Sequence, residues 1–234
     1  TASVSQFAIA LLLEVCHHVG AHSESVHAGE WASNADWCYW NYPLIELEGK
    51  TFGLCGCGKI GGHTGAIAKA LGMRVLIYDP YPNDAGRAIG EYVTLDELYA
   101  RSDVITLHTN ATAENHHLIN ADAIAKMKDG VLLVNTARGT LIDPDALVTG
   151  LECGKIGGAG LDVIEDETGI CYYNRMGEAI PNRELNLLRS YPNVILSPHT
   201  AFYTDVNVAN MVKSPFEALD AYAHGRPYAG EVQL

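Results

Sequence analysis

The chain has 234 residues, of which 48% are hydrophobic and 18% charged, and its formal net charge at pH 7 is −13. That length allows one large domain, or one domain with part of a second, and the apolar fraction is ample for a core. A nucleic-acid groove or an anionic membrane surface needs clustered Lys and Arg, so the acidic balance argues against both partners. A small anionic ligand needs only a local basic pocket and is not excluded.

The six cysteines have neither a Cys-x-x-Cys pair nor zinc-ligand spacing, and Cys55 and Cys57 lie in or beside a glycine turn. We therefore interpret the cysteines as reduced thiols, which predicts a cytoplasmic protein. The adjacent pairs His17–His18 and His116–His117 are interpreted as surface residues, because neighbours on a helix point in different directions, and no metal site is predicted. The apolar run 7–13 is too short to span a bilayer, and it lacks the basic flank of a signal peptide.

The first fifty residues precede any chemical motif. Apolar residues at helical spacing predict one long helix over residues 1 to about 28, with Thr1 or Ser3 as its N-cap. The segment 31–42 then combines several large aromatic rings with turns, which is typical of a core edge or a subunit contact.

From Thr51 onward, short apolar runs alternate with helix-compatible stretches, and this alternation predicts an α/β fold with a doubly wound parallel sheet. The predicted strands cover residues 52–55, 74–78, 91–93, 104–108, 131–135, 158–163 and 193–196. The predicted helices run over 60–71, from a capping box at Thr94-x-x-Glu97, over 120–126, from Asp143–Pro144 to Gly150, and over 204–223 with Pro215 inside.

The stretch 51–79 is the most informative, because its first apolar run leads into Gly56-x-Gly58-x-x-Gly61 and a helix. The first glycine permits a tight turn, the second lets a pyrophosphate approach the backbone, and the third lets the helix pack on the strand. Asp79 ends the next strand, where its carboxylate can bind ribose hydroxyls and would repel a 2′-phosphate. These features predict an NAD site, against the alternative of a glycine-rich turn with no ligand.

In such sheets, ligands bind at the carboxyl ends of the strands. There, Arg138 could clamp a carboxylate, or it could form a structural salt bridge. His199 could exchange protons near neutral pH, or it could be a capping or core histidine. Glu165 or Glu167 could orient His199, or both could belong to a solvated acidic loop.

Ordered segments along essentially the whole chain resemble the D-isomer-specific 2-hydroxyacid dehydrogenases. They are Gly56-Cys-Gly-Lys-Ile-Gly61, Tyr78-Asp-Pro80, Val134-Asn-Thr-Ala-Arg-Gly139, Leu141-Ile-Asp143, Gly154-Lys-Ile-Gly157, Leu161-Asp-Val163 and Ser197-Pro-His-Thr-Ala-Phe-Tyr-Thr204. The stretches 165–174 and 199–203 are most similar to the D-lactate dehydrogenase branch of the family. The segment 44–50 is more similar to the glycerate dehydrogenase branch.

The resemblance implies that Arg138 binds the substrate carboxylate, that His199 is the proton donor and acceptor, and that Glu167 rather than Glu165 orients His199. It implies that Asp162 contacts the nicotinamide amide. The full set implied to contact NAD is Gly56, Gly58, Lys59, Ile60, Gly61, Asp79, His108, Thr109, Asn115, Thr136, Ala137, Arg138, Asp162 and His199.

The resemblance also implies an NAD-binding domain over residues 1–200 and a C-terminal segment of a substrate domain over 201–234. Family members begin with a further substrate-side part, ahead of the long helix with which this chain begins. The implied activity is reduction of a small 2-oxo acid with NADH to a D-2-hydroxy acid, with pyruvate favoured, in a homodimer. The alternatives are D-glycerate dehydrogenase and a dinucleotide-sensing interaction module like the corepressors that share this fold.

Overall fold

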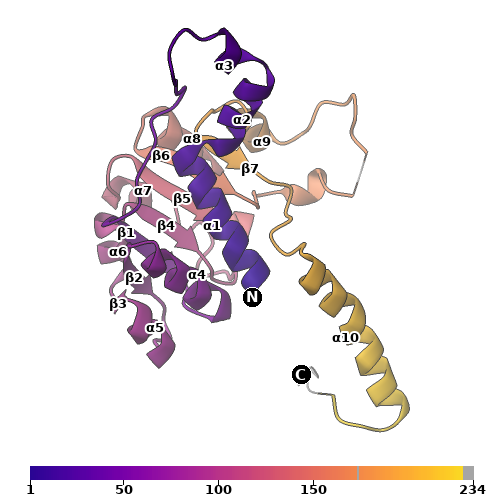
Figure 1. Ribbon diagram of the computed structural model, residues 1–234. Coiled ribbons are helices and arrows are strands. Elements are labelled where there is room, and N and C mark those ends of the chain that lie inside the picture. The colour runs from indigo at the N-terminus through magenta and orange to yellow at the C-terminus, as the bar shows by residue number, and fades with distance from the viewer. Residues whose placement is uncertain (173, 229–234) are drawn as a thin grey trace.

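The computed structural model describes residues 1–172 and 174–228, which form a parallel sheet covered by helices (Figure 1). The seven strands are β1 Thr51–Cys55, β2 Arg74–Tyr78, β3 Glu91–Tyr92, β4 Val104–Leu107, β5 Val131–Asn135, β6 Ile156–Leu161 and β7 Val194–Leu196. They pair in the order β3-β2-β1-β4-β5-β6-β7, and every pairing is parallel. The strand order reverses between β1 and β4, which is where open α/β sheets bind their ligands. The predicted fold class is confirmed.

The helices cover both faces of the sheet, apart from the last helix, which extends away from it (Figure 1). They are α1 Ala2–His17, α2 Val19–His27, α3 Glu30–Ser33, α4 Lys59–Ala70, α5 Asp84–Ile89, α6 Leu95–Arg101, α7 Ala121–Lys126, α8 Pro144–Glu152, α9 Arg183–Leu188 and α10 Asp205–Ala223. Leu132 and Val134 pack with α1 and α4 in one core, whereas Leu133 between them packs with α6, α7 and α8 in the other. Alternate residues of one strand therefore serve opposite layers, which explains why the strands read as unbroken apolar runs.

Small residues in β6 determine where α1 lies. A Cβ atom on Gly160 would be 3.0 Å from the Cβ of Leu11, and one on Gly158 would be 2.8 Å from Val15. Because these glycines lack side chains, α1 can lie directly on the sheet, and this position brings Val4 to the rim of the pocket described below. The glycine run that predicted a strand thus also seats the first helix.

The prediction of one helix over residues 1–28 is wrong, because the chain bends by 61° between α1 and α2. His18 adopts a left-handed conformation with φ of 47°, and its buried ring lies 4.5 Å from the ring of Tyr42. The interpretation of His18 as a surface residue is therefore also wrong. Thr1 is the N-cap as predicted, but its side chain makes no capping hydrogen bond.

No single helix of the described chain is long and apolar enough to cross a membrane; α1 and α2 would meet that criterion only as a bent pair.

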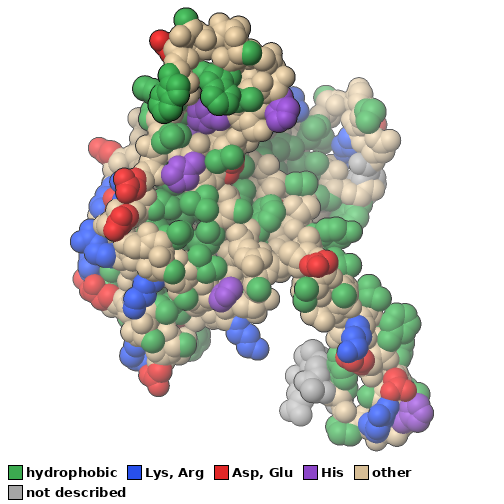
Figure 2. Space-filling model, viewed as in Figure 1, with side chains coloured by type: hydrophobic (Ala, Val, Ile, Leu, Met, Phe, Trp, Pro, Cys, Tyr) green, Lys and Arg blue, Asp and Glu red, His purple; other side chains and the backbone are tan. Residues whose placement is uncertain are grey.

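Two smaller differences concern the end of one helix and the exposure of one segment. Helix α8 continues to Glu152, because Gly150 serves close packing rather than termination: a Cβ there would lie 2.7 Å from Ile156. The rings of Trp31, Trp37 and Trp40 are exposed, so the segment 31–42 is not a core edge, and its role as a subunit contact stays a prediction. Helix α10 extends away from the sheet (Figure 1), and apolar side chains lie open along it (Figure 2).

Candidate active site

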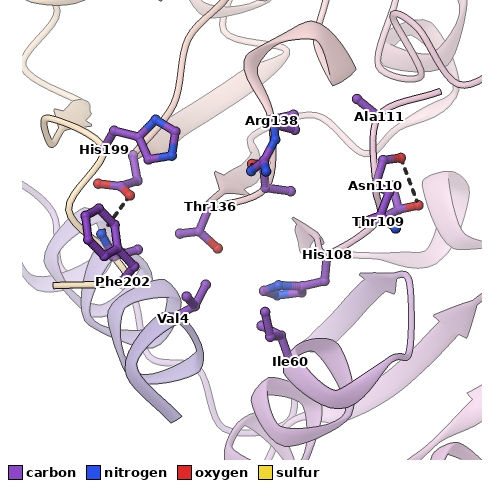
Figure 3. A pocket seen from close by; sticks show the side chains of 13 residues that line it. Val4, Ile60, His108, Thr109, Asn110, Ala111, Thr136, Arg138, His199 and Phe202 are labelled. Atoms are coloured by element: carbon purple, nitrogen blue, oxygen red, sulfur yellow. Dashed lines mark hydrogen bonds between the residues drawn. The ribbon is translucent and has the colours of Figure 1, made fainter. Parts of the chain in front are cut away.

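A pocket of about 550 Å³ opens at the carboxyl ends of the strands, beside the reversal in strand order. Figure 3 shows His199 and Arg138 along one edge of this pocket, with Ile60 and His108 facing them. The lining residues are Val4, Ile60, His108, Thr109, Asn110, Ala111, Thr136, Ala137, Arg138, Asp162, His199, Ala201 and Phe202. Eight of these were predicted from the sequence, and they come from the segments that follow five different strands, β1, β4, β5, β6 and β7.

The glycine turn between β1 and α4 has the geometry that a bound pyrophosphate requires. Gly56 has φ of +92°, a conformation that side chains rarely adopt, and its N–H donates to the carbonyl of Tyr78. A Cβ on Gly61 would lie 2.0 Å from the carbonyl oxygen of Gly56, so only glycine lets α4 pack this closely. A Cβ on Gly58 would meet nothing within 4 Å, which leaves open space at the helix N-terminus. Free N–H groups and the helix dipole make that space a site for phosphate.

Asp79 stands at the end of β2 beside this turn. Its carboxylate accepts hydrogen bonds from the N–H of Cys57 at 2.6 Å and from the N–H of Tyr81 at 2.8 Å. These bonds fix the carboxylate next to the glycine turn, where the ribose of a dinucleotide would lie. Lys59 is exposed at the first position of α4.

Two polar side chains at the pocket wall, Thr136 and His108, are poorly solvated. The Oγ1 atom of Thr136 is buried and has no hydrogen-bond partner among the described residues. An unpaired hydroxyl at a pocket wall is compatible with a polar ligand that would form a hydrogen bond with it. Burial lowers the pKa of His108 to about 4, so its imidazole is neutral at physiological pH, and its Nε2 lies 3.0 Å from the hydroxyl of Thr106.

His199 and Glu167 form a close pair at the edge of the pocket. The Nδ1 atom of His199 lies 2.7 Å from Oε2 of Glu167, and the other carboxylate oxygen of Glu167 accepts from the N–H of Ile164 at 2.8 Å. His199 has φ of 53° and donates its N–H to the carbonyl of Asp162. The pairing therefore involves Glu167, as the motif spacing predicted, and Glu165 turns elsewhere.

Asp162 holds the segment that carries His199. Its buried carboxylate accepts hydrogen bonds from the hydroxyl of Ser197 at 2.6 Å, from the N–H of Thr200 at 2.9 Å and from the N–H of Ala201 at 2.8 Å. Three bonds to one carboxylate define the position of the loop after β7, so Asp162 acts on His199 through the backbone. Sequence reasoning assigned Asp162 only to the cofactor and missed this role.

Arg138 is exposed at the pocket wall and donates one hydrogen bond, from Nη1 to the carbonyl of Ala137 at 2.7 Å. Among the described residues, no carboxylate lies within ion-pair distance of its guanidinium, so the structural salt bridge weighed from the sequence does not form there. An unpaired guanidinium beside a pocket favours a carboxylate ligand.

Asn115 does not line the pocket. Its side chain instead closes the loop after β4, accepting from the N–H of Thr112 and donating to the carbonyl of Asn110. Its contact with NAD stays a prediction. The lining residues missed from the sequence are Val4, Asn110, Ala111, Ala201 and Phe202. None of them is charged, although Ala201 and Phe202 lie in the motif Ser197–Thr204.

Known proteins share this architecture. The family model for the D-isomer specific 2-hydroxyacid dehydrogenase NAD binding domain matches residues 9–201. A hydroxypyruvate reductase of Blautia hydrogenotrophica is 46% identical over 97% of this chain and 67% of its own length. A D-lactate dehydrogenase of Treponema pallidum is 38% identical, over 99% of this chain and 69% of its own length, and its crystal structure superposes with a TM-score of 0.87. The structure of an Aquifex aeolicus D-lactate dehydrogenase with NAD and lactic acid is 36% identical and superposes with a TM-score of 0.84, over 95% of this chain and 66% of that one.

The fold, the glycine turn and the acid at the end of β2 define an NAD-binding domain of the doubly wound type. The chain belongs to the D-isomer-specific 2-hydroxyacid dehydrogenase family. It spans about two thirds of the length of these relatives. The prediction of NAD as the cofactor is confirmed by this membership.

Proposed function

We propose that this chain binds NADH and catalyses its reaction with a small 2-oxo acid, giving a D-2-hydroxy acid. The observation that carries the proposal is the arrangement of the paired His199 and Glu167 beside Arg138, on one edge of the pocket that lies at the NAD-binding strand ends. Family membership supports the reaction class.

Bound NADH supplies the hydride in this reaction. Arg138 binds the substrate carboxylate with two parallel N–H donors, and this positions the neighbouring carbonyl group for reaction. His199 gives a proton from Nε2 to the carbonyl oxygen as negative charge develops there, a contribution typically worth about 10²–10⁴ in rate. Glu167 is bonded to Nδ1 of His199, so it fixes the ring orientation and stabilises the imidazolium.

We propose pyruvate as the favoured substrate, supported by the relatives that are D-lactate dehydrogenases and by the stretches 165–174 and 199–203. Hydroxypyruvate is the second candidate, supported by the 46% identical hydroxypyruvate reductase and the segment 44–50. Aromatic 2-oxo acids are a third candidate, because aromatic 2-oxoacid reductases of Clostridium sporogenes are 40% identical over 90% of this chain.

The test is NADH absorbance with pyruvate, hydroxypyruvate and phenylpyruvate, followed by chiral analysis of the products. Replacing Arg138 by Gln should lower kcat/KM by about 10²-fold, the worth of losing two charged hydrogen bonds. The matched control is Arg183→Gln, since Arg183 is an exposed arginine that pairs with Asp145. An L product, or equal losses in both variants, would contradict the proposal. NADH binding without turnover of any 2-oxo acid would favour the sensing module instead.

We also propose that the protein is a cytoplasmic homodimer in which residues 1–200 form the NAD-binding domain and 201–234 belong to a substrate domain. Free cysteines throughout the described chain support a reducing compartment. Exposed apolar side chains on α10, including Met211 and Phe216, support association. Sedimentation velocity at micromolar concentration checks the dimer, and a monomer would contradict it.

A further inference from the structure

Outside the pocket, two histidines and a glutamate from different loops converge. His116 and His117 lie in the loop after β4, which also carries Thr109, Asn110 and Ala111 at the pocket edge (Figure 3), and Glu165 lies in the loop after β6. The Nε2 atom of His117 is 3.0 Å from one carboxylate oxygen of Glu165, and Nε2 of His116 is 3.4 Å from the other. The proposed dehydrogenase reaction uses none of these three side chains.

Negative charge accumulates around this group. Glu184 is buried, with Oε2 unpaired in the described structure, and the carboxyl groups of Glu165, Asp166 and Asp143 lie near enough to interact with it electrostatically. Four carboxyl groups thus share one region, and the described partners of Glu165 side-chain oxygens are the two imidazoles. A cation bound among these carboxylates would be stabilised by them.

His117 is oriented as a metal ligand would be. Its Nδ1 lies 3.5 Å from the carboxylate of Asp143, which is itself held as the N-cap of α8 by the N–H of Ala146. With its proton on Nδ1, facing this carboxylate, His117 would present the lone pair of Nε2 to an ion bound between it and Glu165, whose oxygen is 3.0 Å away. A carboxylate behind the second nitrogen is the usual support of a metal-binding histidine. The ring of His116 lies 3.8 Å from that of His117 and keeps its own Nε2 on the same side.

We propose that His116, His117 and Glu165 bind a divalent transition-metal ion of the Zn²⁺ type, with an open fourth position. Two nitrogen or oxygen ligands about 2.0–2.1 Å from a tetrahedral ion lie about 3.3 Å from each other. One carboxylate oxygen of Glu165, Oε1, lies 3.3 Å from Nε2 of His117 and 3.4 Å from Nε2 of His116, which matches this spacing. All three ligand atoms lie within 4.8 Å of one another, and His116, whose side chain is 52% exposed, can rotate to close the remaining edge. This proposal replaces the sequence-based expectation of no metal site.

The ion would act on the neighbouring acid–base pair by position. Glu165 is two residues from Glu167, and the side chain of Glu167 already accepts from the N–H of Ile164. A metal on Glu165 would therefore immobilise the loop that orients His199, so occupancy can tune the enzyme without touching substrate.

The experiment is titration of the metal-free chain with Zn²⁺ by calorimetry at pH 7.5, together with the visible spectrum of the Co²⁺ complex. We expect one equivalent, with tetrahedral Co²⁺ bands and no thiolate-to-cobalt charge-transfer band. His116→Asn and Glu165→Gln should each weaken binding at least about 10-fold. Asp143→Asn keeps an N-capping side chain but removes the charge behind His117, and it should weaken binding about 10–100-fold.

The matched control is His63→Asn, which removes an exposed histidine of α4 and should leave the affinity unchanged. Melting temperatures of the metal-free variants show that each one is folded. The site would be overturned by absence of Zn²⁺ binding, or by a thiolate band from an exposed cysteine. It would also be overturned if His116→Asn and Glu165→Gln bound Zn²⁺ as tightly as the original chain. In any of those cases, the two imidazoles are only proton-dependent partners of Glu165.

Discussion

Replacing Gly58 by Ala should separate cofactor binding from folding. The backbone of Gly58 has φ of −75°, which alanine adopts freely, and the added Cβ would meet no protein atom within 4 Å. The helix loses a tolerated N-cap residue, while the unfolded chain loses conformational freedom, so the free energy of unfolding should change by less than about 1 kcal/mol. The methyl group would, however, occupy the space at the N-terminus of α4 where a pyrophosphate would approach. NADH affinity should therefore fall at least about 10-fold, or about 1.4 kcal/mol.

Gly61→Ala makes the contrasting variant in the same turn. Its Cβ would lie 2.0 Å from the carbonyl oxygen of Gly56, against an ordinary contact of 3.4–4 Å, so α4 must move away from β1. Overpacking of this kind destabilises a protein by about 1–3 kcal/mol or more. Thermal unfolding by circular dichroism and fluorescence titration with NADH measure the two effects. Normal NADH binding by Gly58→Ala would refute the placement of the pyrophosphate, and a large loss of its stability would refute the geometry of the turn.

Three further variants test single side chains. Asp79→Asn should raise NADPH affinity at least about 10-fold, because it removes a like-charge clash with the 2′-phosphate while keeping a hydrogen-bond acceptor; fluorescence titration with both cofactors measures this. With EDTA present, Glu167→Gln should move the alkaline limb of the kcat/KM profile for 2-oxo acid reduction to lower pH, because protonated His199 loses its countercharge. Under the same metal-free conditions, Glu165→Gln should leave that limb in place. The reverse result would mean that the wrong glutamate has been assigned. Burial, and then the neighbouring carboxylates, raise the pKa of Glu184 from 4.5 to about 7. The protonated side chain therefore stabilises the fold fully below pH 4.5. This stabilisation, up to about 3 kcal/mol, is lost as the pH rises to 7. Urea unfolding in EDTA should therefore show Glu184→Gln to be more stable than the original chain at pH 8 but not at pH 4.5, and an equal difference at both pH values would argue against a raised pKa.

The sheet could be predicted because its signals are local. Every strand except the two-residue β3 contains a short apolar run, and the capping box at Thr94 and Glu97 forms as predicted. The break at His18 could not be predicted in the same way. Its buried ring packs on Tyr42, a contact with a residue far along the chain, and nothing in the helical periodicity of residues 1–28 reports it.

The candidate site likewise has some features that the sequence predicts and others that have no sequence signal. The pairing of His199 with Glu167 followed from motif spacing, and the structure places both side chains together. The anchoring role of Asp162 depends on backbone N–H groups, which have no sequence signature. The convergence of His116 and His117 was missed because adjacent residues diverge on a helix. These two lie in a loop, where the φ of 52° at His117 lets their rings lie side by side.

The central claim is that this pocket transfers hydride from NADH to a 2-oxo acid with D stereochemistry. The most direct measurement is a single-turnover reaction of excess chain with NADH and pyruvate, with lactate identified by chiral chromatography, for the original chain and for His199→Asn. We predict that NADH binds to both proteins, that the original chain forms D-lactate, and that the variant forms it at least about 10²-fold more slowly. Formation of L-lactate, or an equal rate in the variant, would contradict the account.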